Sequence, residues 1–101
     1  MRPRVLKAAE DEILEAALYY EDRQHGLGFD FYEQVSETIA AIGKSPLRFP
    51  VYEGEHLEHE FRRAQIRRFP YIVVYQVRPQ ETLVVAIAHT SRKPGYWEGR
   101  V

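Results

Sequence analysis

The spacing of apolar residues changes once along this chain, and that change limits the folds open to it. Before residue 43 apolar side chains recur every three or four positions, whereas after residue 60 they alternate or run continuously. The first spacing is typical of an α-helix with one buried face, and the second of β-strands. A segment containing Pro46, Pro50 and Gly54 separates them. The sequence therefore predicts helices followed by a sheet, which is the order of an α+β domain.

Two helices are predicted in the first half of the chain. The first covers residues 8–23, with an apolar face formed by Ile13, Leu14, Ala17 and Leu18. The link Gly26-Leu27-Gly28 interrupts the pattern, and the face of the second helix is formed by Phe31, Val35, Ile39 and Ile42. Gly43 is expected to cap this helix ahead of Pro46. Because the link is short, the helices should be antiparallel and direct their apolar faces at a common surface.

The second half of the chain predicts a sheet. In residues 61–69 the polar side chains of Arg63, Gln65 and Arg67 alternate with Ala64 and Ile66, as in a strand with one covered and one wet face. Residues 71–77 and 82–89 are rich in β-branched residues and predict a central hairpin. Residues 4–6 are expected to add an edge strand. The predicted order is β-α-α-β-β-β, with two antiparallel helices on one face of a mostly antiparallel sheet.

Length and composition narrow the class of protein. The chain has 101 residues, of which 45% are hydrophobic, so we expect one globular domain over residues 1–101. It has no cysteine, which excludes disulfide scaffolds, zinc–thiolate sites and thiol nucleophiles. It has neither the apolar stretch of a signal peptide nor a run long enough to span a membrane. These features favour the reducing cytoplasm.

Charge is distributed unevenly along the chain. Residues 1–60 contain 6 Lys and Arg against 13 Asp and Glu, a net charge of −7, whereas residues 61–101 contain 8 against 2, a net charge of +6. Such segregation indicates either a surface for an acidic partner or charges that pair with each other in the fold. Seven of these eight basic residues form the candidate group: Arg62, Arg63, Arg67, Arg68, Arg92, Lys93 and Arg100. If they converge, they predict a site for RNA, DNA or an acidic peptide; otherwise they protect a strand edge against aggregation.

A cluster of functional side chains follows the last predicted strand, comprising His89, Arg92, Lys93, Tyr96 and Trp97. A histidine and an arginine can cleave a phosphodiester, since imidazole moves a proton and guanidinium stabilises the charge of the phosphorane. The alternative is structural: His89 caps the sheet through a backbone hydrogen bond while Tyr96 and Trp97 pack over the core. The ordinary pKa of a tyrosine is about 10, so Tyr96 is a reluctant acid and is better suited to stacking.

Two other groups of residues carry no predicted chemistry. The segment His56-Leu57-Glu58-His59-Glu60 contains two histidines but not the His-Glu-x-x-His order, and it lies in or next to a loop, so we expect no metal site. The acidic residues Glu10, Asp11, Glu12 and Glu15 are accounted for by the first turns of a helix. No phosphate-binding glycine loop or nucleophile elbow is present. We expect no cofactor.

The order of several short segments resembles the RelE/ParE superfamily of toxins over about the whole chain. These are Ile13 to Tyr20, Gly26-Leu27-Gly28-Phe29, Ser45-Pro46-Leu47-Arg48-Phe49-Pro50, Arg67-Arg68-Phe69-Pro70-Tyr71 and Ala86-Ile87-Ala88-His89 through Tyr96-Trp97. The resemblance implies a toxin of a type II, plasmid-stabilisation-type toxin–antitoxin module, bound tightly by a cognate antitoxin, with the β-α-α-β-β-β fold. An antitoxin tail that folds on binding is expected to contact the partner-binding residues Arg63, Arg67, Arg68, Arg92, Lys93, Tyr96 and Trp97.

The superfamily offers two mechanisms. RelE-like members cleave mRNA on the ribosome, and here His89, Arg92 and Tyr96 are the catalytic candidates for such a ribonuclease. ParE-like members act on DNA gyrase without known hydrolytic chemistry. Ile72 stands where RelE-like enzymes carry a functional arginine, and the long helices and the Phe69-Pro70-Tyr71 strand entry resemble the ParE branch. The sequence therefore favours a gyrase-binding toxin, with ribosome-dependent mRNA cleavage and a degenerate, non-toxic binding module as the alternatives.

Overall fold

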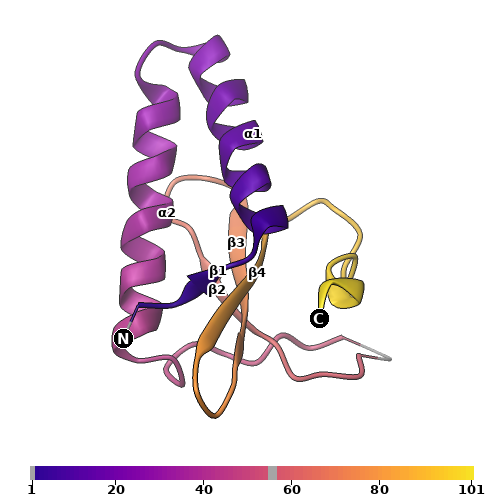
Figure 1. Ribbon diagram of the computed structural model, residues 1–101. Coiled ribbons are helices and arrows are strands. Elements are labelled where there is room, and N and C mark those ends of the chain that lie inside the picture. Colours follow the sequence, from indigo (N-terminus) through magenta and orange to yellow (C-terminus); the bar gives the residue numbers. More distant parts are fainter. Residues whose placement is uncertain (1, 55–56) are drawn as a thin grey trace.

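A helical hairpin covers one face of a four-stranded sheet (Figure 1). A computed structural model describes residues 2–54 and 57–101. The elements are β1 (Arg4–Val5), α1 (Lys7–Arg23), α2 (Leu27–Lys44), β2 (Arg62–Gln65), β3 (Tyr71–Val77) and β4 (Thr82–His89), followed by a 3₁₀ turn over Glu98–Arg100. The predicted α+β class and the order β-α-α-β-β-β are confirmed. Neither described helix is apolar enough over its length to cross a membrane.

The sheet has the strand order β1-β4-β3-β2. The predicted hairpin β3–β4 lies at its centre, antiparallel, with Tyr71 opposite His89 at one end and Val77 opposite Thr82 at the other. Strand β2 pairs antiparallel with β3, and the short β1 pairs parallel with β4. Strand β2 ends earlier than the predicted 61–69 segment because the chain turns at Arg68, which has a positive φ of 72°.

The core between the helices and the sheet is built mainly by α2 and aromatic rings. The predicted apolar face of α2 is buried, with Phe31 and Val35 at 0% and 1% exposure. Phe31 packs edge-on against Phe69 and Tyr71, and Tyr20 of α1 closes the cluster. Edge-on packing of this kind adds to the burial of apolar area. The ring cluster therefore fixes both helices against the start of β3.

The predicted buried face of α1 is wrong in part. Leu14 and Leu18 are 60% and 62% exposed, whereas Ala9 and Ala16 are buried. The reason is the approach of α1 to β4, because small alanine side chains let the two backbones come close. Residues 9, 13, 16 and 20 then point at the sheet, and Leu14 and Leu18 lie towards the opposite side of the helix.

The glycines of the helical hairpin also differ from expectation. Gly26 alone breaks the helix, with φ 88°, while Gly28 lies inside the first turn of α2 and Gly43 inside its last. Glu21 of α1 accepts hydrogen bonds from the backbone N–H groups of Gly26 and Gly28 at 3.0–3.1 Å. These bonds hold the pKa of Glu21 below its usual value. A Cβ atom on Gly28 would lie 2.4 Å from the carbonyl oxygen of Ala17, so glycine permits the close crossing of the helices.

The face of the sheet opposite the helices is covered, contrary to the expectation that it is wet. Along β2 the predicted alternation is confirmed, with Ala64 buried between exposed Arg63 and Gln65. A second core nevertheless lies on the face that Arg63 shares with Val74, and its buried members are Phe61, Val74, Leu83, Val85, Ala86, Ala88 and Trp97. The C-terminal segment brings Trp97 over these strands, and Tyr52 and Leu57 pack beside it. A period of two cannot show which distant segment will cover the second face.

The crossing at Gly28 leads to a stability prediction. Gly28→Ala should lower the free energy of unfolding by about 1–3 kcal/mol, because the added methyl group meets backbone that cannot move away. The measurement is chemical denaturation followed by circular dichroism. Gly99→Ala is the matched control, since a Cβ there meets nothing within 4 Å, and it should change the free energy by less than about 0.5 kcal/mol. Equal effects of the two substitutions would contradict the close crossing.

Candidate functional site

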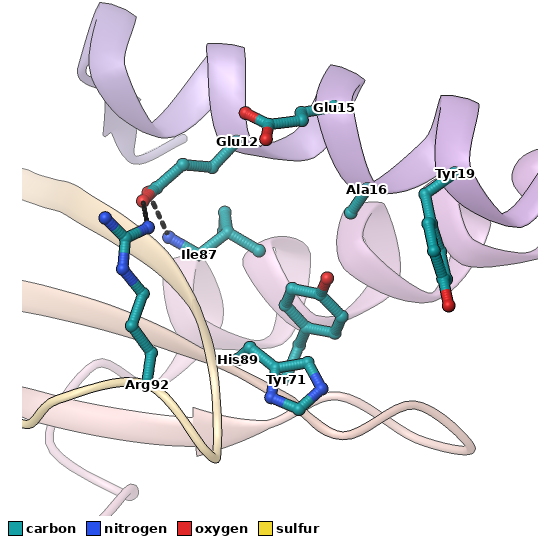
Figure 2. A pocket seen from close by; sticks show the side chains of 8 residues that line it. All are labelled: Glu12, Glu15, Ala16, Tyr19, Tyr71, Ile87, His89 and Arg92. Atoms are coloured by element: carbon teal, nitrogen blue, oxygen red, sulfur yellow. Dashed lines mark hydrogen bonds and ion pairs between the residues drawn. The ribbon is translucent and has the colours of Figure 1, made fainter.

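A cavity of about 180 Å³ lies between α1 and the end of β4 (Figure 2). Its lining consists of Glu12, Glu15, Ala16, Tyr19, Tyr71, Ile87, His89 and Arg92. Helix α1 supplies the acidic side chains, β3 and β4 supply Tyr71 and His89, and the turn after β4 supplies Arg92. Two of the three catalytic candidates from the sequence, His89 and Arg92, thus line one cavity, whereas Tyr96 does not.

Glu12 is the most highly connected side chain of this site. Its carboxylate accepts hydrogen bonds from the Ile87 backbone N–H at 3.0 Å and from the Tyr96 hydroxyl at 2.5 Å. The Arg100 guanidinium donates to both carboxylate oxygens, at 2.9 and 3.1 Å. The Arg92 guanidinium lies 3.6 Å away, as the dashed line in Figure 2 marks. Since the Glu12 side chain is only 13% exposed, these partners compensate the cost of burying its charge.

Glu12 and Arg100 also complete the edge of β4. Strand β1 pairs only with Leu83 and Val84, so it ends before the second half of β4. Beyond that point Glu12 accepts from the N–H of Ile87, and Arg100 donates to the carbonyl oxygen of Val85 at 3.0 Å. Buried backbone groups need such partners. An ion pair of side chains therefore takes the place of a longer edge strand.

Tyr96 is held between two arginines behind the cavity. The Arg92 guanidinium lies 3.8 Å from the centre of its ring, and that of Arg100 lies 5.2 Å away. Burial and the hydrogen bond to Glu12 raise the pKa of Tyr96 far above its ordinary value. The hydroxyl therefore keeps its proton at neutral pH and donates its hydrogen bond to Glu12. In this arrangement Tyr96 supplies neither an acid nor a base to the cavity.

His89 is fixed in one tautomer by the turn that follows β4. Its Nδ1 atom accepts a hydrogen bond from the Ser91 backbone N–H at 3.0 Å, and the Ser91 hydroxyl lies 2.7 Å from the same atom. A nitrogen that accepts an N–H carries no proton, which assigns the proton of the neutral ring to Nε2. The ring packs edge-on against Tyr71 at 5.0 Å. These contacts agree with the structural alternative given above, in which His89 caps the sheet through a backbone hydrogen bond.

Trp97 lies in the second core rather than on a surface. It is 1% exposed, and Tyr52, Phe61 and Tyr96 pack edge-on around its ring. Its indole N–H is buried without a hydrogen-bond partner among the described residues. Among the described residues, the position of Trp97 is therefore set by the packing of its ring and not by a hydrogen bond. A partner reaches this side chain only if the C-terminal segment moves.

The remaining basic residues proposed for partner binding do not converge on the cavity. Arg63 and Lys93 are exposed, and neither has an ion-pair partner within 4.0 Å in the described part of the chain. Arg68 faces Asp30 of α2 at 3.8 Å. Arg67 lines a different cavity, beside α2. The acidic first half and the basic second half thus pair extensively with each other, which reduces the net positive surface.

Glu12 is the residue at the centre of the site that the sequence interpretation missed, because it assigned Glu12 to an acidic helical turn. Its partners lie 75 to 88 positions away in the chain, so no local pattern reveals them. One signal was present. Glu12 falls between Ala9 and Ala16 on the stripe of α1 that faces the sheet, and a carboxylate on a buried stripe requires partners.

Of the segment considered for metal binding, His56 lies outside the described residues. His59 is exposed, and its ring lies 6.4 Å from that of Phe61. These two facts give no geometry for a metal site.

Comparison with known families agrees with this architecture. The family model of the ParE toxin of type II toxin-antitoxin systems, parDE, matches residues 4–94. The chain belongs to this ParE toxin family. The match begins at β1 and ends just after Arg92, so it includes both helices, the whole sheet and the cavity. No curated protein matches the chain.

The network around Glu12 leads to a second stability prediction. Glu12→Ala should lower the free energy of unfolding by about 2–3 kcal/mol, because it leaves the Ile87 N–H, the Tyr96 hydroxyl and the Arg100 guanidinium without their acceptor. Glu15→Ala, one turn along the same helix on an exposed side chain, is the control and should cost less than about 0.5 kcal/mol. Urea denaturation followed by Trp97 fluorescence measures both. Similar midpoints for the two variants would contradict the role given to Glu12.

The raised pKa of Tyr96 leads to a prediction for alkaline pH. Because the folded protein holds this pKa above its unfolded value, Tyr96 contributes stability that is fully present below about pH 10 and is lost as the pH rises further. The wild type should therefore lose stability more steeply than Tyr96→Phe between about pH 9 and pH 11. Tyr32→Phe, at an exposed ring, should keep the wild-type slope. Denaturation midpoints across this range measure it, and parallel curves for wild type and Tyr96→Phe would rule it out.

Proposed function

We propose that this ParE-family toxin arrests growth in the cytoplasm by binding DNA gyrase, and that a cognate antitoxin neutralises it. Membership of the family supports a toxin of a toxin–antitoxin module. The observation that carries the choice of gyrase over RNA is the state of the Tyr96 hydroxyl. This hydroxyl donates its hydrogen bond to Glu12 and has a raised pKa, so it is unavailable for proton transfer.

Cleavage of RNA needs a base for the attacking 2′-hydroxyl, an acid for the leaving oxygen and a cation for the phosphorane. In this chain Arg100 is committed to Glu12, and Arg92 faces the same carboxylate. His89 uses Nδ1 to accept from Ser91, which leaves its Nε2 as a donor when the ring is neutral. The three catalytic candidates His89, Arg92 and Tyr96 therefore offer one donor and one partly neutralised arginine, which do not make an acid–base pair.

A toxin that works by binding needs only an exposed surface, and the helical hairpin offers one. Its large exposed apolar side chains are Leu14, Leu18, Tyr19, Phe29 and Tyr32. Large exposed apolar side chains on two neighbouring helices support a protein–protein contact surface there. Our proposal also keeps the exposed residues Arg63, Arg67 and Lys93 as contacts for an acidic antitoxin segment. Both features support recognition of proteins by this chain.

Ribosome-dependent mRNA cleavage is the second candidate, because His89 and Arg92 face one cavity together with Glu15 and Tyr71. In that case His89 would act through Nε2, and the Ser91 contacts would position the ring. A chain that has lost toxicity but keeps the fold and binds its antitoxin is the third candidate.

Two assays on the same purified protein separate these candidates. We expect the wild type to inhibit supercoiling by gyrase and to leave mRNA on ribosomes intact. His89→Ala should retain growth inhibition within about twofold, since a binding toxin does not require a proton-transfer residue at that position. The controls are the denaturation midpoint of the variant and its binding to the antitoxin encoded beside the toxin gene.

The opposite result is equally clear. If the wild type cleaves mRNA on ribosomes, and if His89→Ala abolishes toxicity while the protein folds and binds antitoxin, the gyrase proposal is wrong. Arg92 and Tyr96 would then join His89 as catalytic candidates. Inactivity of the wild type in both assays and in growth would support the non-toxic module.

A further inference from the structure

Two arginines from different parts of the chain line a second cavity, beside α2. Arg48 lies in the segment that follows α2, and Arg67 in the turn between β2 and β3. The cavity has a volume of about 240 Å³, and its other lining residues are Gln34, Glu37, Thr38, Ala41, Phe49 and Gln65. We call it the Arg48–Arg67 pocket. It lies next to β2, which is at the opposite edge of the sheet from β1 and therefore away from the Glu12 cavity.

Neither arginine of this pocket has an acidic partner within 4.0 Å in the described part of the chain. Six other arginines do have an acidic partner within this distance: Arg4, Arg62, Arg68, Arg78, Arg92 and Arg100. Among the described residues, Glu37 lines the same pocket but forms no ion pair with either guanidinium. Both arginines thus line one cavity, and neither is paired there with a carboxylate of the described residues.

Arg48 is held by a fixed backbone and by a stacking contact, without an ion pair among the described residues. The hydroxyl of the buried Tyr75 donates to the carbonyl oxygen of Pro46 at 2.5 Å, and Arg62 donates to that of Phe49 at 2.7 Å. These two bonds fix the segment on both sides of Arg48. The Arg48 guanidinium itself stacks over the ring of Phe49, 4.7 Å from its centre. The fixed backbone and the stacking contact restrict this side chain before any ligand arrives, which lowers the entropy lost on binding.

Arg67 lies in a turn that is fixed in a similar way. The Gln65 side-chain amide donates to the carbonyl oxygens of Ile66, Phe69 and Tyr71, each at 3.0 Å. The next residue, Arg68, has a positive φ of 72° and faces Asp30 at 3.8 Å, so the turn is also tied to α2. Two turns that hydrogen bonds hold in place therefore bring Arg48 and Arg67 to the lining of one cavity.

We propose that the Arg48–Arg67 pocket receives a glutamate or aspartate side chain of the antitoxin. Guanidinium groups pair with a carboxylate through two parallel hydrogen bonds, and two such groups can hold both of its oxygens. Ala41 and the ring of Phe49 offer an apolar wall for the methylene groups of the incoming side chain. This inference rests on the proposed function, since it takes the antitoxin as the partner.

The surroundings of the pocket favour a single carboxylate over a nucleic-acid backbone. A phosphate backbone carries repeated charges and is bound by rows of cations. Here Glu37 lines the pocket and Glu33 is exposed one turn earlier on α2. These carboxylates would repel the phosphates on either side of one held by the arginines. An acidic side chain on a peptide brings a single charge, so it meets less of this repulsion than a phosphate backbone does.

The test measures binding of the antitoxin encoded beside the toxin gene to variants of the full chain. Arg48→Glu and Arg67→Glu should each weaken binding about tenfold, the effect of losing one charge-assisted hydrogen bond. Arg23→Glu is the matched control, because Arg23 is exposed, stacks on Tyr19 and has no acidic partner within 4.0 Å among the described residues. It should change binding less than about twofold.

Two further measurements separate a shared site from a general effect of charge. With Arg48→Gln and Arg67→Gln, the loss for the double variant should differ from the product of the single losses, because both arginines hold one carboxylate. Substituting lysine for the antitoxin residue that occupies the pocket should restore binding to Arg48→Glu. Equal losses in Arg23→Glu, or strictly independent losses, would overturn the proposal.

A single-stranded oligouridylate serves as the nucleic-acid probe. If Arg48→Glu and Arg67→Glu weaken its binding and leave antitoxin binding unchanged, the pocket is an RNA site and the proposal is wrong. Inhibition of gyrase by the wild type without antitoxin is measured separately. If that inhibition is absent while the antitoxin binds through the pocket, the proposed gyrase function fails and this inference stands.

Discussion

One carboxylate joins three parts of the chain that are far apart in sequence. Glu12 connects α1 to the open edge of β4 through Ile87, and to the C-terminal segment through Tyr96 and Arg100. The C-terminal segment in turn places Trp97 over the second face of the sheet. The cover of that face thus depends on a polar contact at one end and on an apolar ring at the other. Neither alone orients the segment, because the buried Trp97 N–H makes no directional contact among the described residues.

Ion pairs between the two halves of the chain reduce the positive charge that is free to bind a partner. In sequence the basic second half suggests one large anion-binding surface, but Glu12, Asp30 and Glu60 of the acidic half lie next to its arginines. A charge that is paired within the fold contributes little to binding a partner. The exposed arginines without such a pair carry the remaining binding capacity. Three of them, Arg48, Arg63 and Arg67, lie around β2 and the segment after α2, away from the Glu12 cavity.

Local patterns predicted the parts of the fold that depend on local periodicity, and failed where distant contacts decide. The helices, the central hairpin, the short β1 and the alternation along β2 follow from the spacing of apolar residues. The exposure of Leu14 and Leu18 does not, because the rotation of α1 is set by how closely its alanines approach β4. The cover of the second face and the contacts of Glu12 also depend on residues that are distant in sequence. At the site, the sequence grouped His89, Arg92 and Tyr96 after the last strand but could not show that Tyr96 is bound to Glu12.

A group that stabilises the fold is poorly placed to transfer protons as well. Catalytic proton transfer needs a group whose pKa lies near the working pH and whose hydrogen bonds exchange during the reaction. Tyr96 meets neither condition, since Glu12 and burial raise its pKa and the bond to Glu12 helps to hold the C-terminal segment. Breaking that bond in each turnover would release the segment that covers the second face of the sheet. A toxin that only binds its target keeps the bond intact, and the arrangement around Glu12 is therefore compatible with binding and unfavourable for RNA cleavage.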